Sequence, residues 1–225
     1  MKEVNRNAWV GLLRLVLSLA IFIFVPAWTL QYWQAWLCLL VFFTSVTVIT
    51  VYLVQANPAL LERRMKVGAQ AETEKSQKLI QTIAAVVFVA IFVVPSLDHR
   101  LHWSTMAVGF EFLGDALMLT GFSFVFWVFK ANSFTSGIIE VAADQKVITS
   151  GPYALVRHPM YLGSLIMLAG IPLSLGSWWG LILIGVMTGA IVLRLLDEEK
   201  FLARHLKGYE EYVKRVRYRL APFVW

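Results

Sequence analysis

Charged residues are scarce in this sequence, at 15% of the chain, whereas about a quarter of the residues in a soluble domain are charged. Hydrophobic residues account for 59%, and the mean hydropathy is +0.68. A soluble domain is about 45–50% apolar. The low charge therefore excludes an ordinary soluble domain and predicts an integral membrane protein.

Cysteine is nearly absent as well. The single cysteine, Cys38, lies inside an apolar run, which excludes a disulfide framework and a cysteine-based metal site. The four histidines show neither HxxxH nor HExxH spacing, so we expect no metal cofactor. They are His99, His102, His158 and His205.

Long apolar runs are what the chain does have. Six of them cover residues 9–30, 35–56, 79–97, 106–129, 161–176 and 177–196. About twenty apolar residues cross a bilayer, so the first four and the last are long enough. The fifth has only sixteen residues, and we expect it to form a helical hairpin with the sixth. The first is too long for a cleaved signal peptide and carries Arg14. The sequence thus predicts an all-α bundle of five to six transmembrane helices.

Positive charge is distributed unevenly between the two sides of this predicted bundle. Seventeen of the 20 Lys and Arg residues fall on one side, in both termini and both long loops. The positive-inside rule makes that side cytoplasmic. The net charge of +6 is explained by this placement and by attraction to anionic lipid headgroups, without a nucleic-acid partner.

We expect residues 1–225 to form one domain, with four transmembrane helices in 1–129 and the half that would carry a binding site in 130–225. The outer loops are short, which places a ligand pocket at the cytoplasmic face. Residues 57–78 form a basic amphipathic segment that we expect to lie among lipid headgroups.

The stretch "GPYALVRHPMYLG" interrupts the apolar pattern just before the fifth run. A proline disfavours helical backbone in the residue before it, so His158 is expected to be extended. Pro159 then suits the first turn of the next helix. The pair Arg157 and His158 therefore stands at a helix N-terminus, a geometry that suits an anion.

Tyr153 and Tyr161 in the same stretch offer aromatic faces to a flat ring or a sulfonium. Arg, His and Tyr also favour the headgroup zone, so the alternative is an interfacial anchor. In the last run, Arg194 and Glu198 are four residues apart and share a helix face. An ionisable residue at that depth indicates function, and its alternative is snorkelling to the interface.

Two further features of the apolar runs have structural interpretations. Glu111 and Asp115 lie toward the outer half of the fourth run, far from the inner face, and we expect a structural or interfacial role for them. Gly185 and Gly189 form a weak helix-packing motif.

The pairing of "TSGPYALVRHPMYLG" with the later "RLLDEEKFL" and "YEEYVKRV" resembles the isoprenylcysteine carboxyl methyltransferases and the related phospholipid methyltransferases. These are integral membrane enzymes that use S-adenosylmethionine. The resemblance is firm over residues 130–220. It implies S-adenosylmethionine as the cofactor of a pocket on the cytoplasmic face.

The resemblance also implies roles for single positions. Arg194 matches an arginine at the methyl-accepting substrate, and Glu198 matches a carboxylate that holds the cofactor. Family members often carry a histidine where this chain has Gln145. The expected cofactor-binding residues are Gln145, Val147, Ile148, Tyr153, Arg157, His158, Pro159, Tyr161 and Glu198.

The expected methyl acceptor is an amphiphile or a small molecule. A prenylated thiol or carboxylate, a lipid amine and a small thiol each fit. Steroid 5α-reductases, which use NADPH, share a similar R-H-P-x-Y-x-G string, but an acidic residue usually follows their glycine, where this chain has Ser164. A non-enzymatic scaffold or transporter, the third alternative, predicts polar residues at mid-membrane rather than at the inner face.

Overall fold

The computed structural model describes residues 2–65, 68–72, 74–142 and 144–225. These residues contain α-helices and short 3-10 turns, with no strand among them. The elements are α1 (Lys2–Ala27), α2 (Trp33–Ala56), α3 (Pro58–Met65), η1 (Ala69–Ala71), α4 (Lys75–Leu101), α5 (Val108–Ala131), η2 (Gly151–Ala154), α6 (Pro159–Ser174), α7 (Trp179–His205) and α8 (Tyr209–Arg215). Five helices are long and apolar enough to cross a membrane, and α6 is a shorter apolar helix. The predicted all-α membrane bundle is confirmed.

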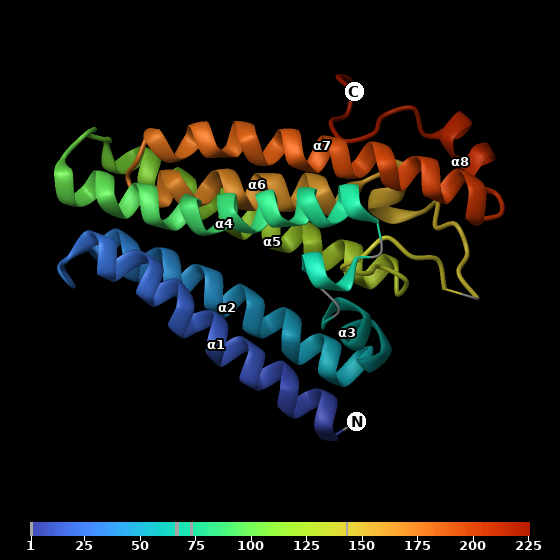
Figure 1. Cartoon of the computed structure of the whole chain (residues 1–225), viewed down its shortest axis with the longest axis horizontal. Helices are drawn as coiled ribbons and strands as arrows, with labels where there is room; N and C mark the ends of the chain where they lie inside the picture. Colours follow the sequence, from blue (N-terminus) through green and yellow to red (C-terminus); the bar gives the residue numbers. More distant parts are fainter. Residues whose placement is uncertain (1, 66–67, 73, 143) are drawn as a thin grey trace.

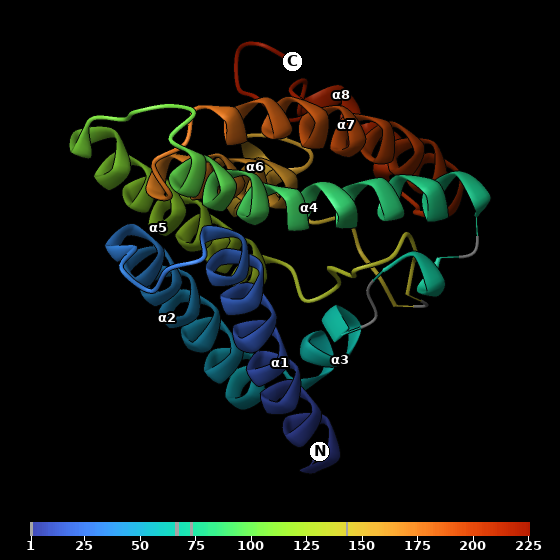
Figure 2. The ribbon, with the colours of Figure 1, turned by 60° about the vertical axis from the view of Figure 1, so that its left-hand side comes forward.

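The long helices run back and forth along the longest axis of the molecule (Figure 1). Both termini, α3, α8 and the segment between α5 and α6 therefore lie at one end, which we call the polar end. Figure 2 shows α1 and α2 leaning away from the other long helices toward this end. The two termini share one side, as the charge pattern predicts, and its assignment to the cytoplasm stays a prediction.

Helices α5 and α6 pack backbone against backbone through glycines. A Cβ on Gly114 would lie 2.2 Å from the backbone nitrogen of Ser174, and one on Gly170 would lie 2.5 Å from the carbonyl oxygen of Gly114. Small residues allow such close approach between membrane helices. At Gly185 and Gly189, by contrast, a Cβ would meet nothing within 4 Å in the described part of the chain. The two glycines of the predicted packing motif therefore make no close helix contact among the described residues.

Carboxylates hold the turn between α6 and α7 at the end opposite to the polar end. Ser174 donates a 2.5 Å hydrogen bond to Asp115, and Ser177 donates one of 2.5 Å to Asp98. Glu111 is 5% exposed and accepts a 3.1 Å hydrogen bond from a glutamine amide of α2. These contacts give Glu111 and Asp115 a structural role and fix the hairpin that carries the candidate site.

Candidate functional site

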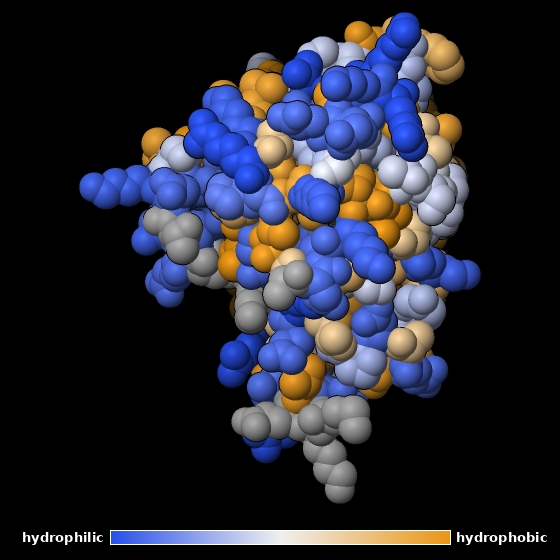
Figure 3. Space-filling view, turned by 90° about the vertical axis from the view of Figure 1, so that its right-hand side faces the viewer, coloured by the Kyte–Doolittle hydropathy of each residue, from blue (hydrophilic) through white to orange (hydrophobic). Residues whose placement is uncertain are grey.

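A cavity of about 360 Å³ lies at the polar end, a volume typical of small-molecule sites, which measure about 300–1,000 Å³. Hydrophilic residues cover most of this end, and hydrophobic residues show between them (Figure 3). All ten residues predicted from the sequence line the cavity, and their roles in it stay predictions. They are Gln145, Val147, Ile148, Tyr153, Arg157, His158, Pro159, Tyr161, Arg194 and Glu198.

The start of α6 is fixed by its proline and by the C-terminal tail. Pro159 is the first residue of the helix, and His158 before it has φ −121° and ψ 62°. This backbone is not helical, as expected for a residue that precedes proline, although it is less extended than predicted. The backbone N–H groups of Arg157 and His158 donate to the carbonyls of Tyr218 and Arg219, both at 2.9 Å. The C-terminal tail is thus hydrogen-bonded through its backbone to the segment before α6, which forms part of the cavity wall.

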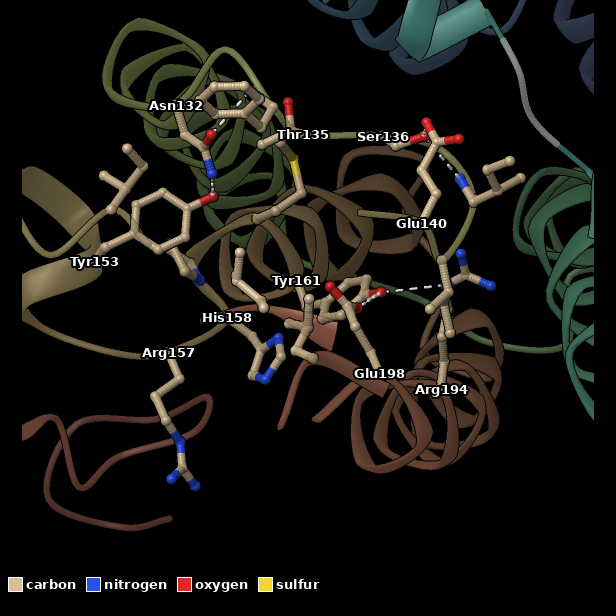
Figure 4. Close-up of a pocket in the computed structure, with 18 of the residues that line it drawn as sticks. Asn132, Thr135, Ser136, Glu140, Tyr153, Arg157, His158, Tyr161, Arg194 and Glu198 are labelled. Atoms are coloured by element: carbon tan, nitrogen blue, oxygen red, sulfur yellow. Dashed lines mark hydrogen bonds between the residues drawn. The ribbon is translucent and has the colours of Figure 1, made fainter. Parts of the chain in front are cut away.

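Three basic side chains contact Glu199 behind the cavity wall. Its Oε1 lies 2.9 Å from Nε of Arg157 and 3.3 Å from Nε2 of His158, and its Oε2 accepts a 2.9 Å hydrogen bond from Arg219. The Arg157 side chain extends away from Tyr161 (Figure 4). The charge of Arg157 is thus paired with Glu199, and a role of this charge toward a ligand anion stays a prediction.

Arg194, Tyr161 and Glu198 form a directed hydrogen-bond chain (Figure 4). Nε of Arg194 donates to the Tyr161 hydroxyl at 3.1 Å, and that hydroxyl donates to Oε2 of Glu198 at 2.5 Å. An arginine can only donate, so the Tyr161 hydroxyl accepts from Arg194 and donates its own hydrogen bond to Glu198. The other oxygen of Glu198 remains for a ligand hydroxyl or ammonium.

The rest of the Arg194 guanidinium is held by protein groups. Nη1 donates to Glu72 at 2.7 Å and to Gln77 at 3.1 Å, and Nη2 donates to the carbonyl of Gly137 at 3.1 Å. Arg194 is 9% exposed and Glu72 is 5% exposed. The guanidinium group of Arg194, which we expected to bind the methyl acceptor, is thus already paired with a carboxylate of the chain.

Tyrosines form the opposite wall. The Tyr153 hydroxyl accepts a 2.9 Å hydrogen bond from Asn132, and the Tyr212 hydroxyl donates to the carbonyl of Tyr153 at 2.8 Å. Burial raises the pKa of both phenols, so they stay neutral. The buried hydroxyls of Tyr209 and Thr135 also belong to lining residues and have no hydrogen-bond partner among the described residues. Buried polar groups are normally paired, so these two are free donors for a ligand.

The remaining lining residues add an apolar surface and few further polar groups. Val147 packs against the hydrophobic cluster of α8, and Ile148, Leu202 and Leu206 also line the cavity. The side-chain oxygen of Gln145 accepts a 3.0 Å hydrogen bond from a nearby backbone N–H and so holds its own turn. In the described part of the chain no group of three or more His, Cys, Asp or Glu residues is arranged to hold a metal ion.

Sequence analysis missed the part of the site that comes from residues 57–78. We expected one amphipathic surface segment, but the structure has α3, η1 and the start of α4, and it turns Arg64 and Glu72 inward. One signal was available, since Gln77 and Gln81 stand four apart at the head of an apolar helix and so share a face. Gln77 contacts Arg194, and Gln81 lines the cavity.

A family model and a known protein each match part of this chain. Residues 110–208 match the family model of the phospholipid methyltransferases, so the predicted resemblance is confirmed over that range. A mouse Δ14-sterol reductase is 34% identical over 90 residues, which are 39% of this chain and 22% of the reductase. The chain thus matches about a fifth of the length of that relative.

Proposed function

We propose that this protein is a membrane methyltransferase that uses S-adenosylmethionine and binds it in the cavity at the polar end. One observation carries the proposal. The segment that matches the phospholipid methyltransferase family, residues 110–208, supplies all ten predicted residues on the cavity wall. A family match alone does not fix an activity, but here the matched segment supplies most of the cavity wall.

The chemistry of the lining residues fits this cofactor. The free oxygen of Glu198 suits a ribose hydroxyl or the ammonium group, and the faces of Tyr153 and Tyr161 suit the adenine ring or the sulfonium. Val147 and Ile148 add apolar surface for a flat ring, and the unpaired Tyr209 hydroxyl adds a donor. When bound, S-adenosylmethionine would supply a methyl group on a positively charged sulfur: a lone pair of the acceptor would form a bond to the methyl carbon while the carbon–sulfur bond breaks, and neutral S-adenosylhomocysteine would leave.

The protein contributes alignment and exclusion of water, which supply much of the rate enhancement of a two-substrate reaction. The chain from Arg194 through Tyr161 to Glu198 fixes the direction of each hydrogen bond across the cavity. Arg194 lies one helical turn deeper in the bundle than Glu198, on the path of a molecule that arrives from the bilayer. We assign Arg194 to the acceptor side and Glu198 to the cofactor side.

The acceptor in this proposal is an amphiphile or a small molecule reached from the cytoplasmic face. Five helices able to cross a membrane give it access to lipid-borne molecules. The cavity that Arg194 lines has both apolar and polar residues, among them Ile138, Ile191 and Gln81. A prenylcysteine-type carboxylate, a lipid amine and a thiol all fit this mixed surface.

The likeness to the mouse sterol reductase supports a second candidate, an NADPH-dependent membrane oxidoreductase. Equilibrium binding of radiolabelled S-adenosylmethionine and of NADPH to the detergent-purified protein separates the two. We expect saturable binding of S-adenosylmethionine and none of NADPH at the same concentrations. Binding of NADPH alone would replace the methyltransferase proposal with the reductase, and binding of neither would leave the non-enzymatic scaffold.

A further inference from the structure

The arginines on the cavity wall differ in their counter-charges. Arg157 is paired with Glu199, and Arg194 is paired with Glu72. Arg64 of α3 also lines the cavity, but no carboxylate of the described residues lies within 4.0 Å of its guanidinium. Among the described residues, Arg64 is thus a cation of the wall that forms no ion pair.

The contacts that Arg64 makes are with uncharged groups. Its Nη1 donates to the carbonyl of Ser136 at 2.7 Å, and its guanidinium carbon lies 5.5 Å from the ring centre of Phe129. That hydrogen bond uses one of the five N–H donors of an arginine. The two contacts fix the side chain on the cavity wall and leave donors for a ligand.

The surroundings of Arg64 make an anion at this place favourable. Burial lowers the pKa of its guanidinium, and the neighbouring Arg194 also lowers it, while Tyr161, Tyr153 and Glu198 raise it. An arginine stays protonated in proteins even so. Because Arg64 is half-buried and lies close to the positive charge of Arg194, an anionic ligand group beside Arg64 would be stabilised there.

We propose that Arg64 binds a carboxylate of the ligand held in this cavity. The inference rests on the proposed function, which offers two sources of that carboxylate, the methionyl end of the methyl donor and the methyl acceptor. The planar guanidinium of an arginine matches a carboxylate with two parallel hydrogen bonds. Arg64 takes the role that the sequence had suggested for Arg157, whose charge Glu199 compensates.

The neighbouring arginine of α3 provides a matched control. Nη1 of Arg63 donates to the carbonyl of Ser133 at 3.0 Å, and its guanidinium carbon lies 5.2 Å from the ring centre of Phe134. Arg63 is not among the residues that line the cavity. Arg63→Gln therefore removes the same charge, a similar hydrogen bond and a similar ring contact at a residue that does not itself line the cavity.

The first arm of the test concerns the donor. S-adenosylhomocysteine carries the methionyl carboxylate, and 5′-methylthioadenosine has the same nucleoside without it. If the donor brings the carboxylate, Arg64→Gln weakens binding of S-adenosylhomocysteine at least tenfold and changes binding of 5′-methylthioadenosine less than twofold. Arg63→Gln leaves both affinities unchanged, and Arg64→Lys retains part of the difference.

The second arm concerns the acceptor and uses dodecanoate and dodecanol in a neutral detergent. If the acceptor brings the carboxylate, Arg64→Gln leaves S-adenosylhomocysteine binding intact and weakens dodecanoate at least fivefold relative to dodecanol. The proposal is overturned if neither carboxylate is weakened more than in Arg63→Gln, or if ligands with and without a carboxylate lose affinity equally. A wild-type protein that binds dodecanoate but no adenosyl ligand refutes the proposed function, and the dodecanoate arm still decides the role of Arg64.

Discussion

Arg157 and Glu199 form an ion pair behind the cavity wall, with 2.9 Å between Nε and Oε1 and with side chains that are 5% and 13% exposed. The pair joins the segment before α6 to the part of α7 beyond Glu198. His158 and Arg219 reach the same carboxylate, so Glu199 holds α6, α7 and the C-terminal tail together. Glu199 therefore holds the elements of the cavity wall in place and does not itself bind the ligand.

Glu199→Gln is therefore expected to destabilise the protein by about 3 kcal/mol, because removing one member of a buried ion pair leaves the other charge uncompensated. The measurement is thermal unfolding in detergent. Glu210→Gln is the control, since Glu210 is exposed on α8. Equal unfolding temperatures for the two variants would contradict the role of Glu199.

Glu198→Ala and His158→Ala are expected to weaken S-adenosylmethionine binding at least tenfold. A tenfold change is about 1.4 kcal/mol, modest for the loss of a charge-assisted contact in a partly dry pocket. Equilibrium binding to the purified variants measures it, with His205→Ala as the control because His205 is exposed and stacks on Phe201. Wild-type affinity in both folded variants would remove these residues from the site.

The sequence predicted the parts of this site that depend on local chemistry. The start of α6 follows from the backbone limits of Pro159, and the shared face of Arg194 and Glu198 follows from helix periodicity. The partner of Arg194 could not be predicted in this way. Glu72 is 122 residues away in the sequence, and only the course of the chain between α3 and α4 brings it to the cavity.

The direction of the Arg157 side chain was equally out of reach of sequence reasoning. Their adjacency in the sequence suggested that Arg157 and His158 act together on a ligand, whereas the tail pairs with their backbone and Glu199 pairs with the Arg157 charge.

The glycines that pack α5 against α6 are spaced seven residues apart in both helices. The spacing alone does not identify the helix that each glycine faces; the structure shows that Gly114 packs against Gly170.

Gly114→Ala is expected to disrupt the packing of α5 against α6. The new Cβ would lie 2.2 Å from a backbone nitrogen of α6 and 2.6 Å from a backbone carbonyl, and neither can move without shifting the helix. We expect a loss of about 3 kcal/mol or more, at the upper end of overpacking effects. Thermal unfolding in detergent measures it against Gly185→Ala, where nothing described lies within 4 Å. Similar stabilities of the two variants would contradict the close α5–α6 contact.

Both termini are expected to face the cytoplasm, because they share the polar end with the basic loops. Single cysteines placed at the two ends of a Cys38→Ser variant, labelled with a membrane-impermeant maleimide, measure this. We expect labelling only after the membrane is opened. Labelling of the C-terminal cysteine from outside in intact cells would reverse the orientation and move the cavity to the other face.

Arg194→Lys is expected to impair methyl transfer more than cofactor binding. A lysine ammonium can still approach Glu72, but it lacks the planar fork that also contacts Tyr161 and the Gly137 carbonyl. Tyr161 then loses the donor that directs its proton to Glu198. We expect a transfer rate at least 100-fold lower, roughly 2.7 kcal/mol of transition-state stabilisation, with S-adenosylmethionine affinity near that of the wild type.

Both quantities are measured on the same purified protein, with Arg204→Lys as the control because Arg204 lies on the exposed end of the same helix. The comparison separates two roles that the contacts of Arg194 allow. A residue that serves the acceptor changes the rate and leaves the cofactor affinity alone, because Glu198 keeps its free oxygen. If Arg194→Lys loses affinity and rate in equal proportion, Arg194 acts through Tyr161 on the cofactor, and the acceptor is positioned by other residues of the wall.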